Sequence, residues 1–589
     1  LEALSPQNER KAKGKLYYEL APLIEKEDVS RAIEYYEKAS RIFGDEEFPQ
    51  EYFQIQLTLA RLQTESLDFT SIDKFIAQAI MIGQELDIPP DFTPDKLPLS
   101  WTYLQEAVET AIDIGAQQYH NQKERVIIDK IVDWSNLRKV TRLLPFLAEN
   151  IGFNQCKELL KLHQEETSLI AMASDFRKQL MTLSPKGSPP EEYQKQRTSL
   201  RTDLREIMEK INVNRNVIAA ACQDPGRHLI PQDYKMLQKL AALMPIDRRW
   251  ILINYDVLLK KQRIIITTLD HVGRHNLHTL PISPDLPSVI EKLQTITVAK
   301  QLPRMADLKD IASFLYRSLI PSRLERDLQN NNYGFLQFIT DGFLSNVPFE
   351  LIFDGKEYWG TKYPMAWTPD LQFFESTLKI KALAESGSSS VILGVNFDPE
   401  RQSARKTHAE EITKTFLGAV PTRSGITEPI VLFGRDFNRA LLSSNLDQPR
   451  SLLFLSTPAS IHYRKGEITL QPPDSLRTIE IGVSFSFKGA PILVLSESSR
   501  IEPRADGYSL AGFLRHLVAA GSPSIVFSRW HPVTQFQSAF AQTLLKQLYE
   551  GDPIAVALLH TRRKLASKGP SPHSWLSYSL CGNPFPTLF

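Results

Sequence analysis

From Trp250 onward, short apolar runs rich in β-branched residues alternate with stretches that have the apolar period of an amphipathic helix. Such runs predict strands. Strands that alternate with helices form a mainly parallel sheet covered by those helices. The sequence therefore predicts an α/β domain, which we place at residues 231–589. Its predicted strands are Trp250–Tyr255, Arg263–Asp270, Gly334–Thr340, Val391–Asn396, Pro429–Phe433, Ser451–Ser456, Pro491–Ser496 and Ser524–Ser528, the first two forming an antiparallel hairpin. Its predicted helices are Leu286–Val298, Asp307–Leu319, Ala409–Phe416, Arg435–Leu442, Leu510–Ala520, Phe536–Tyr549 and Ile554–Ala566.

The first part of the chain, residues 1–185, has helical periods and few strand-like runs. Ala32–Phe43 has apolar side chains at helical spacing with small residues among them, and Ser71–Ile80 repeats the pattern. Small residues let neighbouring helices approach closely, as in helix-pair repeats. The first of these segments resembles the second helix of a tetratricopeptide (TPR) repeat, so we predict a TPR-like helical region. An irregular helical bundle is the alternative. Further predicted helices are Arg125–Leu137, Val140–Glu149 and Gln155–Lys178.

Between these parts, residues 186–230 are predicted to form a linker and a connector helix. The segment Leu183–Pro190 is rich in Pro, Gly and Ser, which is typical of a loop. A strongly charged helix is predicted from Glu191 to Asn212. Its apolar face consists of Leu200, Leu204, Ile207, Met208 and Ile211.

Composition excludes several classes of function. The 589 residues are 42% hydrophobic and 23% charged, with a formal net charge of +1, so no overall field favours nucleic acid or a membrane surface. We expect no direct nucleic-acid partner and no membrane span, since no apolar run is long enough. The first residues show no signal peptide pattern. The three cysteines, Cys156, Cys222 and Cys581, have no metal-ligand spacing and are expected to be reduced thiols in the cytoplasm.

Two of the predicted strands end where a parallel sheet places its chemistry, just beyond the carboxyl ends of neighbouring strands. Ser451–Ser456 is followed by Thr457 and Pro458, and Pro491–Ser496 is followed by Glu497 and Ser498. A cysteine peptidase needs a histidine after one such strand and a cysteine after the other. This chain has a proline and a serine instead.

Four further segments resemble the CHAT domain family, caspase-like peptidases that are associated with TPR repeats. Asp341–Ile352 is similar to the family's DGxLxxxPFExL string, and Trp367–Leu371 to its Y-x-P-S-L step. Ala520–Trp530 (AGSPSIVFSRW) is similar to AGAxSVVxSLW, and Trp575–Pro584 to the closing W-x-x-F-x-L-x-G-x-P. The resemblance implies a caspase-like fold that follows a TPR-like region.

The resemblance also implies where the active-site residues would lie. The family's H-x-x-T-H-G segment falls on Phe454–Ala459, so its catalytic histidine corresponds to Pro458 and the following glycine to Ala459. The family's L-S-A-C segment falls on Leu495–Ser498, so its nucleophile corresponds to Ser498. Proline has no titratable side chain and cannot act as the base that an acyl-transfer pair needs. We therefore predict that no catalytic dyad is intact.

An active peptidase with a displaced base is the alternative. His462 follows Pro458 by four residues and is the candidate replacement; His531 follows another strand and is the weaker one. Glu497 is either an ordinary carboxylate or a group that pairs with a partner's Arg or Lys. Cys581 lies in the closing strand and is expected to be packed rather than reactive. The sequence has no phosphate-binding or dinucleotide-binding motif, and we predict no cofactor and no metal.

These features favour a catalytically inactive pseudopeptidase that binds proteins through its helical repeats and its caspase-like domain. An active CHAT paralogue is one possible partner. A further alternative is a structural subunit of a larger effector complex, such as an RNA-guided one. The resemblance implies a bacterial origin and a role in signalling or defence.

Overall fold

This computed structural model describes most of the chain, and its residues fall into two compact units. The described residues are 6–43, 49–65, 74, 99–148, 165, 168–169, 172, 175–176, 179, 183, 190–221, 236–298, 304–380, 390–396, 403–420, 428–457, 459–462, 465–470, 475–477, 487–501, 508–530, 534–569 and 571–588. The first unit comprises Leu1–Thr141, Phe153–Cys222 and Gly226–Pro231; the second comprises Arg142–Gly152, Gln223–Pro225 and Gln232–Phe589.

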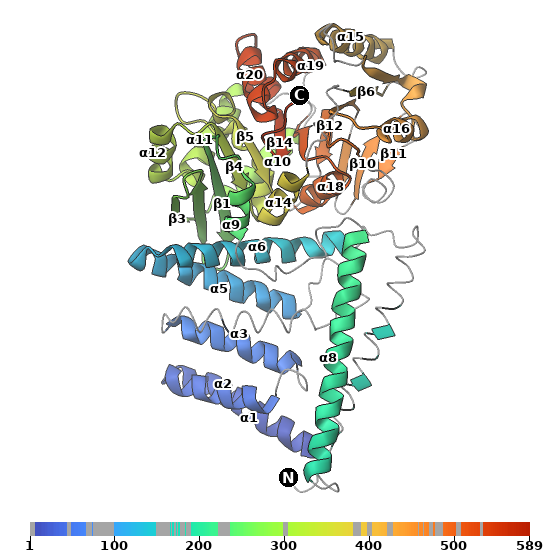
Figure 1. Ribbon diagram of the computed structural model, residues 1–589. Helices are drawn as coiled ribbons and strands as arrows, with labels where there is room; N and C mark the ends of the chain where they lie inside the picture. The colour runs from blue at the N-terminus through green and yellow to red at the C-terminus, as the bar shows by residue number, and fades with distance from the viewer. Residues whose placement is uncertain are drawn as a thin grey trace. The chain divides into compact units, whose positions relative to one another are not determined.

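The described elements of the first unit are helices (Figure 1). Helices α1, α2, α3 and α5 pack in succession, each against the next. One prediction needs correction here: Arg125–Leu137 and Val140–Glu149 are a single helix, α6. The bounds are α1 Pro6–Glu25, α2 Val29–Phe43, α3 Pro49–Glu65, α5 Leu99–Gln122, α6 Arg125–Ala148 and α8 Pro190–Ala221.

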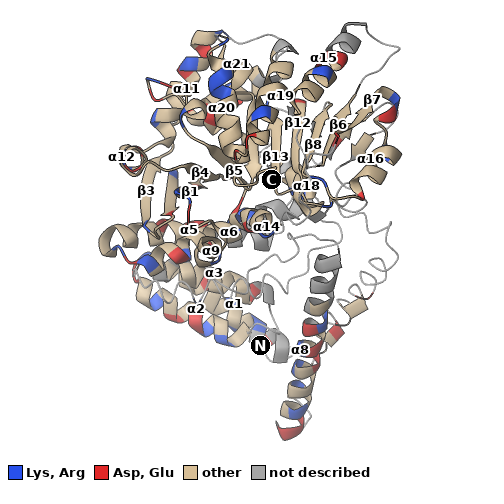
Figure 2. Cartoon of the chain, turned by 45° about the horizontal axis from the view of Figure 1, so that its top comes forward, with Lys and Arg blue, Asp and Glu red and all other residues tan. Residues whose placement is uncertain are grey.

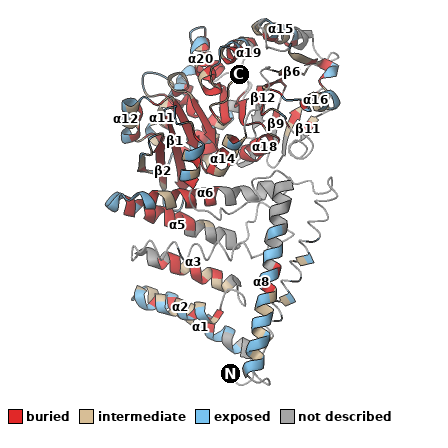
Figure 3. Cartoon of the chain, in the orientation of Figure 1, coloured by how far each residue is buried: buried red, intermediate tan, exposed pale blue. Residues whose placement is uncertain are grey.

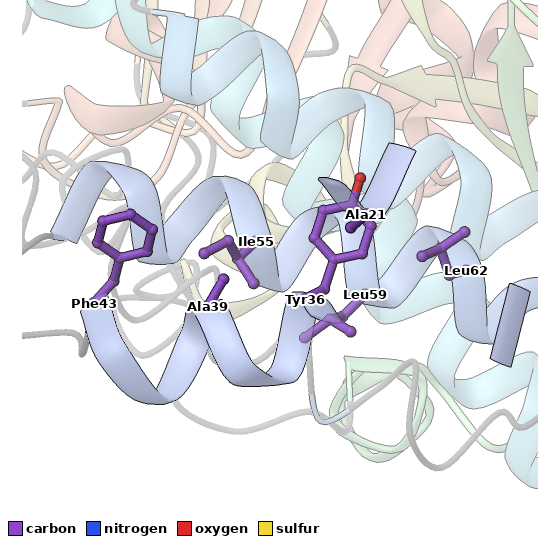
Figure 4. Packing of buried hydrophobic residues seen from close by; sticks show 7 residues of the cluster. All are labelled: Ala21, Tyr36, Ala39, Phe43, Ile55, Leu59 and Leu62. Atoms are coloured by element: carbon purple, nitrogen blue, oxygen red, sulfur yellow. The ribbon is translucent and has the colours of Figure 1, made fainter. Parts of the chain in front are cut away.

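Small residues set the packing of the first helices, as the sequence predicted. Ala32 and Ala39 of α2 are fully buried. Gly14 of α1 lies so close to Phe43 that an added Cβ would be 2.9 Å from the ring. The apolar cluster between these helices (Figure 4) consists of Ala21, Tyr36, Ala39, Phe43, Ile55, Leu59 and Leu62. The predicted repeat partner Ser71–Ile80 lies almost wholly outside the described residues, so the TPR-like arrangement stays a prediction.

Helix α8 covers the predicted helix Glu191–Asn212, is longer than predicted at both ends and belongs to the first unit, so its role as a connector stays a prediction. Acidic and basic side chains are distributed along it (Figure 2). Leu204 and Ile207 are buried and pack with Leu200, Leu169 and Phe176, which confirms part of the predicted apolar face. The predicted helix Gln155–Lys178 lies mostly outside the described residues.

The second unit begins with helix α9 and an antiparallel meander of three strands. Strand β1 pairs with β2 over eight residue pairs, from Ile251↔Asp270 to Leu258↔Arg263, so the predicted hairpin is confirmed. The meander ends with β3, an edge strand that the sequence analysis did not predict. The bounds are α9 Met236–Leu243, β1 Trp250–Leu258, β2 Arg263–Asp270 and β3 His275–Pro281.

The first part of the sheet continues through parallel pairing of β1 with β4 and of β4 with β5. Helix α12, with Leu324 and Leu328 buried, was not predicted. The remaining bounds of this part are α10 Leu286–Val298, α11 Met305–Leu319, α12 Ser322–Asn331, β4 Phe335–Ile339, η2 Gly342–Asn346, η3 Phe349–Leu351, α13 Trp359–Lys362, β5 Met365–Thr368 and α14 Leu371–Lys379.

The second part of the sheet is parallel in the spatial order β7-β6-β8-β12-β13. Strand β14 joins the two parts, antiparallel to β13 and parallel to β5. Its strands are β6 Val391–Val395, β7 Ile430–Phe433, β8 Leu452–Ser456, β9 Ala459–His462, β10 Lys465–Thr469, β11 Ser475–Arg477, β12 Ile492–Ile501, β13 Ser524–Ser528 and β14 Tyr578–Gly582. Its helices are α15 Ser403–Ala419, η5 Gly434–Asp436, α16 Arg439–Leu446, α18 Tyr508–Ala519, α19 Thr534–Tyr549, α20 Ile554–Ala566 and α21 Pro572–Trp575.

The main strands of the second unit are buried (Figure 3), and helices pack on them from both sides. Helices α15, α19 and α20 lie side by side, and α14 contacts α18 (Figure 1). The predicted fold class, a helical region followed by a mainly parallel sheet covered by helices, is confirmed. The predicted helix Arg435–Leu442 is wrong at its start, because Gly434–Asp436 is a 3₁₀ turn and Asn438 caps α16.

Candidate functional site

The candidate site lies at the carboxyl ends of β8 and β12, which are parallel neighbours. Strand β8 ends at Ser456, as predicted. Strand β12 does not end at Ser496; it continues to Ile501 after an irregularity in its pairing between Leu495 and Ser498. The irregularity lets the second half of β12 leave β8 and pair with β9.

Ser498, which the resemblance aligns with the nucleophile, is therefore a residue inside a paired strand. The backbone of Ser498 is in register with Ser528 of β13, and the next residue, Ser499, is in register with Ala459 of β9. Strand pairing on both sides fixes the backbone at this position. The two segments that the resemblance aligns with active-site motifs thus lie next to each other in the sheet. Pro458 lies outside the described residues.

His462 is the last residue of β9, and β9 runs parallel to the end of β12. Because Ala459 is level with Ser499, His462 lies four residues further along the ladder than Ser498. At about 3.3 Å per residue, the two positions are separated by about 13 Å along the strands. A general base needs about 3 Å to the group it deprotonates. His531, the other candidate base, lies outside the described residues.

Short hydrogen-bonding side chains link the ends of the strands around this position. Ser456 Oγ donates to Glu497 Oε1 at 3.2 Å, which joins β8 to β12. Asn396 Nδ2 donates to Thr457 Oγ1 at 3.4 Å, and Thr457 donates to the carbonyl oxygen of Thr469. Glu497 is half-buried and held by Ser456, so it is not the ordinary exposed carboxylate that the sequence allowed.

Beside this edge lie three buried arginines that the sequence analysis did not single out. Arg515 pairs with Asp370, which also caps α14 through the Phe373 amide at 2.8 Å. Arg562 donates to Glu350 at 3.4 Å.

The third arginine, Arg529, follows the last residue of β13. Its Nε donates to Ser579 Oγ at 2.8 Å and its Nη1 to the Ser345 carbonyl at 3.0 Å. The guanidinium lies over the ring of Trp367, 4.9 Å from its centroid. Burial lowers the pKa of Arg529 to about 10, and the nearby Glu350 carboxylate acts against that change. Arg529 therefore stays cationic at neutral pH.

Cys581 lies in β14 and is fully buried, as the sequence predicted. Burial raises the pKa of its thiol well above the usual range, an effect that Arg529 only partly opposes. The thiol is the protonated form at neutral pH, which is the unreactive form. Cys156 and Cys222 lie outside the described residues.

Within the described ranges, no group of three or more His, Cys, Asp and Glu side chains is arranged to hold a metal ion. Among the helices described, none combines the length and the apolar character needed to span a membrane.

Residues 309–583 match the family model of the CHAT domain. This match confirms the family resemblance for that segment, which contains the sheet from β4 to β14 and the candidate site. The segment is thus similar to CHAT domains. The substituted active site and the TPR-like character of the helical region stay predictions.

No curated protein matches the sequence. Among solved structures, the chain is similar to a chain of the Saccharomyces cerevisiae separase–securin complex, at 11% identity and a TM-score of 0.39, covering 97% of this chain and 53% of that one. It therefore spans about half the length of that relative. It is also similar to the Arg-specific cysteine proteinase gingipain R, at 10% identity and a TM-score of 0.32, covering 58% of this chain and 78% of that one. Neither similarity assigns a function.

Proposed function

We propose that this chain is a catalytically inactive CHAT-type pseudopeptidase that acts as a protein-interaction or regulatory module. The observation that carries the proposal is the replacement of the family's histidine by Pro458, together with serine at position 498. Proline has no group that accepts a proton, and serine needs a base even more than cysteine does because its hydroxyl pKa is far higher. Loss of both members of such a pair costs several orders of magnitude in rate.

The register of β9 and β12 supports the proposal. The candidate replacement base, His462, is about 13 Å along the ladder from Ser498. A strand paired on both sides cannot slide by four residues without breaking its hydrogen bonds. The pairing of Ser498 with Ser528 likewise restricts the movement of the nucleophile position toward another base.

The domain arrangement fits a binding role. We place a TPR-like region at residues 1–185, a connector at 186–230 and the CHAT domain at 231–589. Stacked helix pairs expose an extended surface that suits a protein partner. We assign the role to bacterial signalling or defence in the cytoplasm on the resemblance alone, and an active CHAT paralogue is a candidate partner.

A protease assay on the pure chain tests the proposal. The chain is incubated with a proteome-derived peptide library, and new termini are identified by mass spectrometry, with the Ser498→Ala variant as the matched control. We expect the same background of cleavage from both proteins. Specific cleavage that disappears in Ser498→Ala or in His462→Ala would establish an active peptidase with a displaced base and overturn the proposal.

Affinity purification from the source cell distinguishes a free-standing regulator from a structural subunit of a larger complex. A free-standing regulator is expected to be recovered with a substoichiometric partner. A structural subunit of a larger effector complex is expected to be recovered in fixed stoichiometry with several other chains, and with RNA if that complex is RNA-guided.

A further inference from the structure

Arg529 carries a buried positive charge that no carboxylate of the described residues neutralises at salt-bridge distance. Its side chain is 95% shielded from solvent, since Arg529 is only 5% exposed. The two other buried arginines near this edge differ from it, because Arg515 pairs with Asp370 and Arg562 pairs with Glu350. A buried guanidinium with no carboxylate at salt-bridge distance retains much of the cost of leaving water, and the more distant Glu350 carboxylate offsets only part of it.

The hydrogen bonds of Arg529 leave part of its donor capacity unused. Nε and Nη1 donate to the neutral oxygens of Ser579 and Ser345. Within the described residues, Nη2 has no acceptor. Neutral oxygens satisfy a guanidinium less well than a carboxylate does, because charge-assisted pairs are roughly twice as strong.

The fold does not require a charged side chain at the position of Arg529. In the AGAxSVVxSLW string that Ala520–Trp530 resembles, the position of Arg529 is a leucine. A leucine beside the rings of Trp367 and Phe527 would carry no charge and so no cost of removing a charge from water. The arginine therefore needs an explanation other than packing.

The location of Arg529 supplies that explanation. It directly follows Ser528, whose backbone is in register with Ser498. It thus lies at the carboxyl end of β13, level with the point at which β12 turns to pair with β9. The carboxyl ends of parallel strands are where such sheets bind their ligands. A single guanidinium carries one positive charge. A carboxylate carries one negative charge and neutralises it, whereas the charge of a phosphate group is larger.

We propose that Arg529 anchors an aspartate or glutamate side chain of a protein partner that docks at the carboxyl end of β13, beside Ser498. The proposal rests on the proposed function, in which this edge binds protein without cutting it. The site would then bind a peptide without cleaving it. The planar guanidinium of Arg529 holds the acidic side chain, and the neighbouring strand ends contact the flanking peptide.

Pools of acetylated and amidated heptapeptides test this inference. All positions are randomised except the centre, which is Asp, Glu, Asn, Gln or Lys, and binding to the full chain is measured by fluorescence anisotropy. Peptides are then recovered and examined by mass spectrometry for cleavage. The test variant is Arg529→Leu, with Arg529→Gln as its substitute if the leucine variant does not fold.

The matched control is Arg450→Leu. Arg450 is another buried arginine, 8% exposed, which donates to the carbonyl of Asn445 and to Ser390. It precedes β8 and so lies at the opposite, amino edge of the sheet. Its loss removes the same chemistry from the unit without touching the proposed site.

We expect the wild-type chain to prefer the acidic pools over the amide pools by about tenfold or more, as is typical of a buried charge pair. The preference is expected to disappear in Arg529→Leu and to persist in Arg450→Leu. Equal binding of acidic and amide pools by the wild type, a preference that survives in Arg529→Leu, or an equal loss in Arg450→Leu would overturn the inference. Cleaved peptides would instead refute the proposed function, whether or not the acidic preference holds.

Discussion

Asp354 fixes the turn between η3 and α13 by accepting hydrogen bonds on both carboxylate oxygens. The amides of Lys356 and Glu357 donate to Oδ1 at 2.9 and 3.0 Å, and Lys362 Nζ donates to Oδ2 at 2.6 Å. Burial acts to raise the pKa of Asp354, but these hydrogen bonds and the Lys362 charge outweigh it and lower the pKa. The ionised form is thus the form that the folded chain prefers.

The pH dependence of stability follows from that shift. A carboxyl whose pKa is lowered in the folded state stabilises it above the unfolded pKa of about 3.9 and loses that effect as pH falls through the folded pKa. We expect Asp354→Asn to lower the free energy of unfolding by about 1–3 kcal/mol at pH 7. Urea unfolding at pH 7 and pH 3 measures the difference, which should shrink at the lower pH. A difference that is equal at both pH values would contradict this account.

At the scale of the elements, β14 ends at a position where only glycine fits. Gly582 has a φ of +101°, and an added Cβ would lie 2.3 Å from the carbonyl oxygen of Pro523, in the turn before β13. The same backbone region is held by the hydrogen bond from the Asn583 amide to the Pro523 carbonyl at 2.8 Å. Close approach of the two backbones lets β13 and β14 pair up to their ends, from Ser528↔Tyr578 to Ser524↔Gly582.

Gly582→Ala and Gly551→Ala separate steric contact from backbone strain. Gly551 has a similar φ of +94°, but nothing lies within 4 Å of its added Cβ. We expect Gly551→Ala to cost about 1–2 kcal/mol of stability, the strain of a left-handed conformation alone. Gly582→Ala should cost clearly more, about 3 kcal/mol or above, because the strand ends must also move apart. Thermal unfolding of both variants measures the difference, and equal costs would show that the turn yields to the added methyl group.

The sequence predicted the bounds of an element well where the apolar pattern of its own residues defines that element. Helices α10 and α20 begin and end at the predicted residues, and Cys581 is buried as expected. The extension of β12 was not predictable, because Ser499–Ile501 have no strand-like apolar run and pair with β9, a segment some forty residues earlier. Edge strand β3, rich in His and Asn, was missed for the same reason: its pairing with β2 defines it, not its composition.

The sequence predicted that the segments around Thr457 and Ser496 lie on neighbouring parallel strands, and β8 and β12 confirm that pairing. The site itself stays a prediction, and its chemistry could not be predicted. The burial of Arg529 was not predictable, since a charged residue after a strand is usually exposed. Its contacts with Ser345 and Trp367 come from elements more than 150 residues earlier in the chain.

At the scale of the whole molecule, the chain consists of two compact units with separate buried cores. In the first unit, Leu59 is 1% exposed and belongs to the apolar cluster of α1, α2 and α3. In the second unit, the strands of the sheet form the core, and Gly582 lies at the end of β14. Contacts within a unit hold its elements together, so each unit is expected to unfold cooperatively by itself.

Differential scanning calorimetry of the full chain should therefore show two transitions. Leu59→Ala removes buried apolar volume from the first unit, at a cost of about 2–5 kcal/mol, and should lower one transition temperature only. Gly582→Ala should lower only the other transition temperature. The double variant should show both shifts at their single-variant size, because substitutions in independent cores are additive. A single transition that moves with either substitution would contradict this prediction and would mean that the two units unfold as one.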